Sequence, residues 1–334
     1  MKLTALFDEA ATRNASDIHL ATGEVPRLRI AGDLIRLDLP ALDLATFSIL
    51  LDETVSSADR GRLEAGLSVE RTILHGDLGF VGVFFRAGDD GYAATLRVLS
   101  GGIPSLDRIG GAALSLFKRL VDTPRGLALV TGLAGSGKWT TACSIADAIN
   151  AEKPSRIFVV ESHANYLFTS REGMVTQIHA SKSPESYARA LDFAFHADLD
   201  VVAVDDVPTL ETLRAMLLLA ETGHLVIANL HAENAVDALR RLLAGAGPET
   251  EPLRHALAAN LVAVTGQRLL FRANGQGRVP AYDWLVPTPQ IKAALETGDL
   301  QRLLEVQAND PECRSPEASV RELVQAGEIA PNPA

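Results

Sequence analysis

The chain has 334 residues, which is enough for two domains with cores of their own. Its 31 basic and 42 acidic residues give a net charge of −11, which argues against a general nucleic-acid or anionic-membrane surface and favours protein partners. The two cysteines lack metal-ligand spacing. The sequence also shows no signal-peptide core and no run of ~20 apolar residues that could span a bilayer. We therefore expect a cytoplasmic protein that reaches membranes only through partners.

The first hundred residues mix helical and strand patterns, as a small α+β domain does. Helical spacing covers residues 3–11, 42–51 and 58–65, and strand alternation covers residues 17–20, 27–30, 34–37, 69–74, 80–86 and 93–98. Gly101-Gly102-Ile103-Pro104 then indicates a linker, which we place over residues 101–125.

From residue 126 the pattern changes to buried strands that alternate with amphipathic helices, which predicts an α/β domain with a largely parallel sheet over residues 126–334. The four apolar segments are 127–130, 156–160, 201–204 and 225–229. Farther along, a strand over 267–271, a turn over 274–277 and a second strand toward Trp284 precede helical patterns from residues 290 and 316.

The segment from Gly132 to Lys138 reads G-x-x-x-x-G-K between a predicted strand and a helix, which is the context of a phosphate-binding loop. Backbone N–H groups of such a loop surround the phosphates, the following helix dipole assists them, and Lys138 reaches the β- and γ-phosphate oxygens. The predicted nucleotide-binding residues are Gly132, Gly135, Ser136, Gly137, Lys138, Thr140 and Thr141.

Trp139 stands where this loop normally has the Ser or Thr that ligates Mg²⁺. An indole has an N–H donor and no oxygen, whereas Mg²⁺ prefers octahedral oxygen ligands. The sequence therefore predicts ATP binding but leaves Mg²⁺ without its expected hydroxyl ligand. Either the indole fills the metal pocket, or it turns toward the adenine or the core and leaves room for a metal held by Asp206 and water.

Several motifs together resemble the secretion-ATPase superfamily and, more narrowly, the type IV pilus retraction (twitching motility, PilT-like) ATPases. They are the phosphate loop, Ser16-Asp17-Ile18-His19-Leu20, Thr123-Pro124-Arg125-Gly126-Leu127, and Ala220-Glu221-Thr222-Gly223-His224-Leu225-Val226 with Leu230-His231. The resemblance covers nearly the whole chain. It implies a PAS-like domain over residues 1–100 and a RecA-like P-loop ATPase domain over 126–334 with a C-terminal helical part.

The resemblance also implies the assembly and its partners. It predicts a cytoplasmic homo- or hetero-hexamer of PilT-like subunits, in which a neighbouring subunit completes each ATP site. It further implies an inner-membrane platform protein of the pilus as a partner, and no nucleic acid.

Transferred residue by residue, the family's acidic box falls on residues 161–165 and its Walker B motif on Asp205-Asp206. Glu161 is retained and is expected to act electrostatically near the site. The glutamate expected to activate water is replaced by Asn165, whose amide cannot accept a proton near neutral pH. Asp206 keeps a carboxylate that orients water or metal, and Asp205 replaces a glycine and either partly substitutes for a lost acid or faces solvent.

His224 and His231 retain the family's histidine box, which implies a γ-phosphate sensor linked to the subunit interface. Arg86 and Arg97 stand where family members carry N-domain arginines, and the resemblance gives Arg97 a role in trans as a finger that stabilises charge.

Two classes of function follow from these residues. The first is a nucleotide-binding subunit with impaired hydrolysis that regulates, or assembles with, an active relative, and the changes at Trp139 and Asn165 favour it. The second is an active hexameric motor that drives pilus retraction and twitching motility. A nucleic-acid translocase is a distant third because of the acidic net charge.

Overall fold

The computed structural model describes residues 3–30, 32–76, 78–88, 90–99, 102–180, 183–207, 209–247 and 250–331. The chain forms two compact units. The first comprises Met1–Gly102 and the short segment His163–Leu167, and the second comprises Ile103–Ser162 and Phe168–Ala334. The segment 163–167 therefore groups with the first unit, although the sequence had suggested one continuous domain from residue 126.

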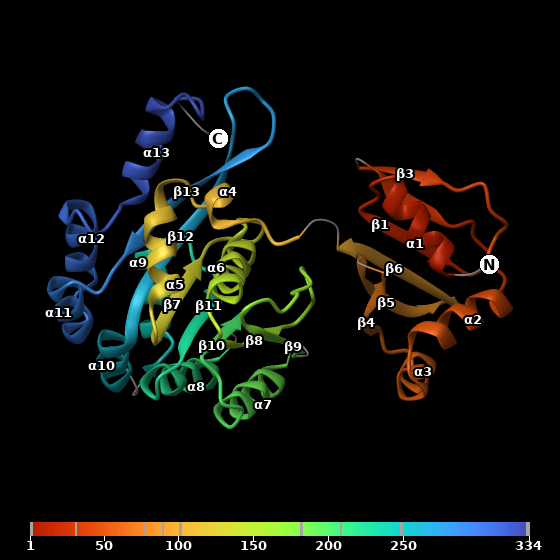
Figure 1. Cartoon of the computed structure of the whole chain (residues 1–334), viewed down its shortest axis with the longest axis horizontal. Coiled ribbons are helices and arrows are strands. Elements are labelled where there is room, and N and C mark those ends of the chain that lie inside the picture. Colours follow the sequence, from red (N-terminus) through yellow and green to blue (C-terminus); the bar gives the residue numbers. More distant parts are fainter. Residues whose placement is uncertain are drawn as a thin grey trace. The chain divides into compact units, whose positions relative to one another are not determined.

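The first unit contains a six-stranded antiparallel sheet in the order β3-β2-β1-β6-β5-β4 (Figure 1). Its strands are β1 (Asp17–Ala21), β2 (Arg27–Ile30), β3 (Asp33–Arg36), β4 (Val69–His75), β5 (Leu78–Ala87) and β6 (Gly91–Leu99). Its helices are α1 (Leu3–Thr12), α2 (Leu44–Thr54) and α3 (Ser57–Glu64). Alternation along β1 buries Ile18 and Leu20, and Phe7 of α1 stacks on Phe80 with ring centroids 4.0 Å apart.

The second unit contains a seven-stranded sheet in the order β13-β12-β7-β11-β10-β8-β9. All of its strands are parallel except the edge strand β13. The strands are β7 (Gly126–Thr131), β8 (Arg156–Glu161), β9 (Met174–His179), β10 (Val201–Val204), β11 (Leu225–Leu230), β12 (Leu261–Phe271) and β13 (Arg278–Leu285). Strands β7, β10 and β11 are buried along their whole length, because helices cover both faces of the sheet.

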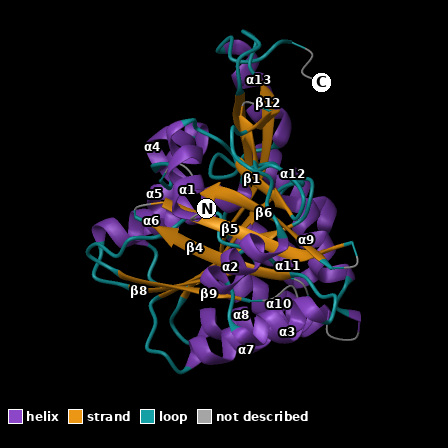
Figure 2. Ribbon diagram, turned by 90° about the vertical axis from the view of Figure 1, so that its right-hand side faces the viewer, coloured by secondary structure: helices purple, strands orange, loops and turns teal. Residues whose placement is uncertain are grey.

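The helices of the second unit flank this sheet (Figures 1 and 2). They are α4 (Leu106–Ile109), α5 (Leu114–Asp122), α6 (Lys138–Glu152), α7 (Pro184–Phe195), α8 (Leu210–Glu221), α9 (Ala235–Ala244), α10 (Thr250–Asn260), α11 (Pro289–Thr297), α12 (Leu300–Asn309) and α13 (Pro316–Gln325), with a 3₁₀ turn η1 (Gly111–Ala113). The crossover through α6 from β7 to β8 and the crossover through α8 from β10 to β11 run in opposite directions across the sheet. Right-handed crossovers therefore place α6 and α8 on opposite faces.

The structure differs from the linker predicted over residues 101–125. Helices α4 and α5 occupy most of this segment, and Leu106, Phe117 and Leu120 are buried in the core of the second unit. The helical spacing of these apolar residues outweighs the glycine and proline signal before them. The α/β fold class is confirmed, and within the described residues no helix combines the length and apolar character needed to cross a membrane.

Candidate nucleotide-binding site

The loop between β7 and α6 is shaped by two glycines. A Cβ atom on Gly132 would lie 2.2 Å from Ser136 Oγ and 2.5 Å from the Gln267 carbonyl oxygen, so no larger residue fits without displacing the loop. Gly137 has a φ of 84° in the left-handed region at the start of α6. The buried Ser136 hydroxyl has no hydrogen-bond partner among the residues that the structure describes. A buried hydroxyl of this kind is suited to a ligand that enters the loop.

Lys138 begins α6 and lies at the carboxyl edge of the sheet, where ligands of open α/β folds bind. Its ammonium donates to the Leu133 carbonyl oxygen at 3.3 Å and lies 3.4 Å from Nδ1 of His231. Burial lowers the pKa of Lys138, and the negative charge of Asp206 opposes this shift. The structure thus brings Lys138, Asp206 and His231 together from three successive parts of the sheet edge.

Thr141 supports the loop from within the unit. Its hydroxyl donates to Gln267 Oε1 at 2.8 Å, and its backbone N–H donates to the Gly137 carbonyl oxygen at 3.1 Å. Both donors of Thr141 therefore already point to protein atoms, and its contact with a nucleotide stays a prediction. Thr140, one residue earlier in α6, is half-buried.

The Trp139 indole is turned toward the acidic residue that ends β8. Its Nε1–H donates to Glu161 Oε2 at 3.1 Å, and the ring packs against the core of the second unit. On the other side, Gln177 of β9 donates to Glu161 Oε1 at 2.8 Å. Glu161 is only 1% exposed, and each of its two carboxylate oxygens accepts a hydrogen bond from one of these side chains.

The two acids after β10 face different partners. Asp205 accepts hydrogen bonds from the Tyr187 hydroxyl and, at 2.7 Å and 2.9 Å, from the backbone N–H and hydroxyl of Ser162. These hydrogen bonds connect the end of β10 to the end of β8. Asp205 therefore stabilises the sheet edge through its carboxylate and does not point freely into solvent. Burial, followed by the hydrogen bond to Asp205, raises the pKa of Tyr187. Asp206 accepts from the Val207 N–H at 2.8 Å and interacts electrostatically with Lys138.

The two histidines of the predicted sensor lie at opposite ends of β11. His231 follows the strand at the loop edge, whereas His224 precedes it, so the length of the strand separates them by about 20 Å. His224 Nδ1 lies 2.9 Å from the Leu219 carbonyl oxygen, and its ring packs near Phe195. The structure therefore brings His231, and not His224, to Lys138.

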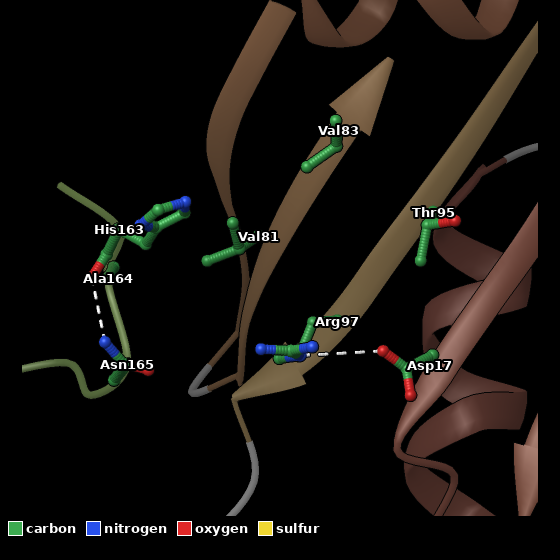
Figure 3. Close-up of a pocket in the computed structure, with 8 residues that line it drawn as sticks. All are labelled: Asp17, Val81, Val83, Thr95, Arg97, His163, Ala164 and Asn165. Atoms are coloured by element: carbon green, nitrogen blue, oxygen red, sulfur yellow. Dashed lines mark hydrogen bonds and ion pairs between the residues drawn. The ribbon is translucent and has the colours of Figure 1, made fainter. Parts of the chain in front are cut away.

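Arg97 and Asn165 belong to the first unit. They line a pocket of about 290 Å³ together with Asp17, Thr95 and His163 (Figure 3). Arg97 is 70% exposed and its Nε lies 3.6 Å from Asp17 Oδ1, while the Asn165 amide donates to the His163 carbonyl oxygen. The action of Arg97 in trans stays a prediction.

The residues around Lys138 do not fit the usual Mg²⁺ site of a P-loop protein, in which the loop hydroxyl and a Walker B acid share the metal. The hydroxyl position is an indole whose polar atom donates to Glu161. The assignment of Asp206 as a metal ligand therefore lacks its usual partner.

Sequence reasoning missed the residues that hold the acids and the loop in place, namely Gln177, Tyr187 and Gln267. Gln177 lies on β9, a partly exposed edge strand that the apolar pattern did not reveal. Tyr187 lies within α7, and nothing in its spacing links it to Asp205. Gln267 carried a signal, because a polar residue begins the predicted strand over 267–271 and is 3% exposed in the structure.

Comparison with known proteins gives consistent results over most of the chain. The family model described as "Type II/IV secretion system protein" matches residues 1–324. The type IV pilus retractation ATPase PilT of Pseudomonas aeruginosa is 31% identical over 87% of this chain and 84% of its own length. A twitching motility protein of Neisseria gonorrhoeae is 30% identical over 92% of this chain and 83% of its own length. The crystal structure of the pilus retraction motor PilT with bound ADP superposes with a TM-score of 0.89 at 32% identity, covering 99% of this chain and 95% of that chain.

Proposed function

Because the chain belongs to the type II/IV secretion system protein family and is similar to PilT in sequence and fold, we propose that it is a PilT-like nucleotide-binding subunit of a type IV pilus machinery. In this proposal its ATP hydrolysis is impaired, and its role is to regulate or to assemble with an active relative.

The observation that carries the proposal is the hydrogen bond from the Trp139 indole to Glu161. The position that normally supplies a hydroxyl ligand to Mg²⁺ is occupied by an indole, which can only donate a hydrogen bond. This indole donates to Glu161, so one acid of the site is already hydrogen-bonded. The base position is the amide Asn165. Loss of a general base costs a factor of about 10²–10⁴ in rate, and loss of metal ligation adds to it because the metal neutralises developing phosphate charge.

Nucleotide binding is supported by the parts of the site that remain. The N-terminus of α6 presents backbone N–H groups, and Gly132 and Gly137 allow the loop its close turns. Lys138 is positioned to bind phosphate oxygens, with Asp206 and His231 beside it. A hollow of about 560 Å³ next to the loop, lined by Leu133, Asn234 and Arg268 among others, gives room for the rest of a nucleotide.

The family resemblance supports the assembly that we propose. The chain would act in the cytoplasm in a homo- or hetero-hexamer of PilT-like subunits, with Arg97 approaching the site of a neighbour. It would meet the membrane through a platform protein of the pilus, and not bind nucleic acid.

The test combines ATP binding by calorimetry with phosphate release from Mg-ATP, using the full chain. We expect the native protein to bind ATP and to release no more phosphate than Lys138→Ala, which should bind ATP at least about tenfold more weakly because it lacks the phosphate-binding cation. The variant Trp139→Ser with Asn165→Glu should gain turnover.

Two outcomes would contradict the proposal. Turnover by the native chain that Lys138→Ala abolishes would show that Trp139 and Asn165 are tolerated and that the protein is a working motor. Equal ATP affinity of the native chain and Lys138→Ala would contradict the assignment of the nucleotide site itself.

A further inference from the structure

The contacts of Trp139 also bear on how the site treats the divalent cation that accompanies a nucleotide. Resting on the nucleotide-binding function proposed above, we infer that this site binds its nucleotide without a protein ligand to a divalent cation, so that it does not distinguish metal-free ATP from Mg-ATP. The affinity for ATP should then be the same in the presence and in the absence of Mg²⁺.

The first reason is the direction of the Trp139 side chain. A Mg²⁺ ion at a phosphate loop bridges the β- and γ-phosphates and takes one protein oxygen from the residue after the lysine. Here that residue has no oxygen in its side chain, and its one polar atom is 3.1 Å from Glu161 Oε2, to which it donates. This bond holds the indole against the core, and rotating the ring would leave the buried Glu161 oxygen without this donor, so the side chain supplies no group in place of the hydroxyl.

The second reason is that the nearby acids are already held by the protein. Glu161 receives Trp139 on one oxygen and Gln177 on the other, and Asp205 receives Tyr187 on one oxygen and Ser162 on the other. To replace a missing metal ligand, either carboxylate would have to give up these donors. The protein therefore supplies no substitute for the hydroxyl among these two acids.

Asp206 is the remaining acid of the Walker B pair, and it faces Lys138. It already accepts from the Val207 N–H, and its charge raises the pKa of Lys138 against the effect of burial. In this arrangement the carboxylate of Asp206 favours the ammonium form of the lysine. The charge of this carboxylate is thus already matched by the lysine ammonium, which reduces its need for a divalent cation.

Phosphate charge can be met without a metal by groups that the structure shows. The Lys138 ammonium contributes a full charge, and the N-terminus of α6 contributes about half a charge and several N–H donors. The Ser136 hydroxyl, which has no hydrogen-bond partner in the described part of the chain, lies in the same loop. None of these groups needs a cation to bind an anion. Metal-free ATP carries more negative charge than its magnesium complex and suits such a site at least as well.

The two tryptophans of the chain allow a direct measurement. Trp139 lies in the site, whereas Trp284 on β13 donates to the Glu312 carbonyl oxygen elsewhere in the second unit. The dissociation constant for ATP is measured on the full chain by calorimetry and by tryptophan fluorescence, once with EDTA and once with Mg²⁺ in excess over ATP. A Trp284→Phe variant assigns the fluorescence change to Trp139.

We expect the two dissociation constants of the native chain to agree within about twofold, because no protein group ligates the metal and the metal therefore does not strengthen ATP binding. In Trp139→Ser the hydroxyl returns and Mg²⁺ should tighten ATP binding by about tenfold or more. Trp139→Phe is the matched control, since it keeps most of the packing but offers no oxygen, and it should remain insensitive to Mg²⁺.

A native chain that binds ATP about tenfold more tightly with Mg²⁺ than with EDTA would overturn this inference and leave the nucleotide-binding function intact. No ATP binding in either condition would overturn both. Because the deciding comparison uses the native chain, it holds even if a variant fails to fold.

Discussion

Asp283 is a buried acid whose replacement should change the pH dependence of stability. It lies on β13 with 3% of its surface exposed, and its Oδ2 accepts from the Ala235 N–H at 2.8 Å and from Gln307 at 3.2 Å. Burial is the largest cause of a shift that raises the pKa of Asp283 to about 6, and the two hydrogen bonds only partly oppose it.

The sign follows from comparing the folded and unfolded states. The ionised carboxylate is disfavoured in the folded protein, so the contribution of Asp283 to stability is greatest below the unfolded pKa of 3.8 and falls as the pH rises to about 6. A rise of about two pKa units corresponds to about 3 kcal/mol in total. Roughly 2 kcal/mol of this should be lost between about pH 4.5 and pH 8.

In Asp283→Asn this loss should disappear, because the amide keeps an acceptor for the Ala235 N–H and does not ionise. The assay is urea unfolding followed by the fluorescence of the neighbouring Trp284 across that pH range. Asp122→Asn, at an acid whose side chain is 79% exposed, is the matched control and should retain the native pH profile. An Asp283→Asn protein with the same pH dependence as the native chain would refute the reasoning.

Three further variants and measurements probe the loop and its supports. Tyr187→Phe should lower the free energy of unfolding by about 1–3 kcal/mol, since it removes a donor to Asp205; an unchanged urea midpoint would contradict this. Gly132→Ala should weaken ATP binding by more than about tenfold while far-UV circular dichroism stays native, because its Cβ meets Ser136 and the Gln267 carbonyl; native affinity would show that the loop can shift. Cys143 is fully buried and burial raises the pKa of its thiol, so it should react with a thiol reagent only on unfolding; fast labelling of the native chain would disprove its burial.

The elements that position the loop could be predicted from the sequence because their signals are local. The apolar run before Gly132 and the helical pattern after it correspond to β7 and α6. Strand β12 shows where a local reading stops short. It begins at Leu261 and not near residue 267, because the apolar stretch after α10 continues straight into the sheet without a glycine or proline to mark its start.

The contacts that decide the chemistry join residues far apart in the sequence. The orientation of Trp139 depends on Glu161 at the end of β8, and Glu161 in turn depends on Gln177 on the next strand of the sheet. The sequence left open whether the indole fills the metal pocket or turns toward the core. The structure shows it packed on the core with its N–H directed to Glu161, a choice set by a buried acceptor that no local pattern encodes.

Trp139 and Asp205 both take part in partly buried hydrogen bonds, and under the function proposed above this bears on how much turnover the double variant can gain. Trp139 gives Glu161 a donor, and Asp205 gives Tyr187 and Ser162 an acceptor. Replacing Trp139 by serine restores a metal-ligating hydroxyl but removes a hydrogen bond from a carboxylate that is 1% exposed, so it should lower stability as it improves the site. The activity gained by the variant Trp139→Ser with Asn165→Glu should therefore be partial, because Glu161 loses the hydrogen-bond donor that holds its carboxylate in place beside the site.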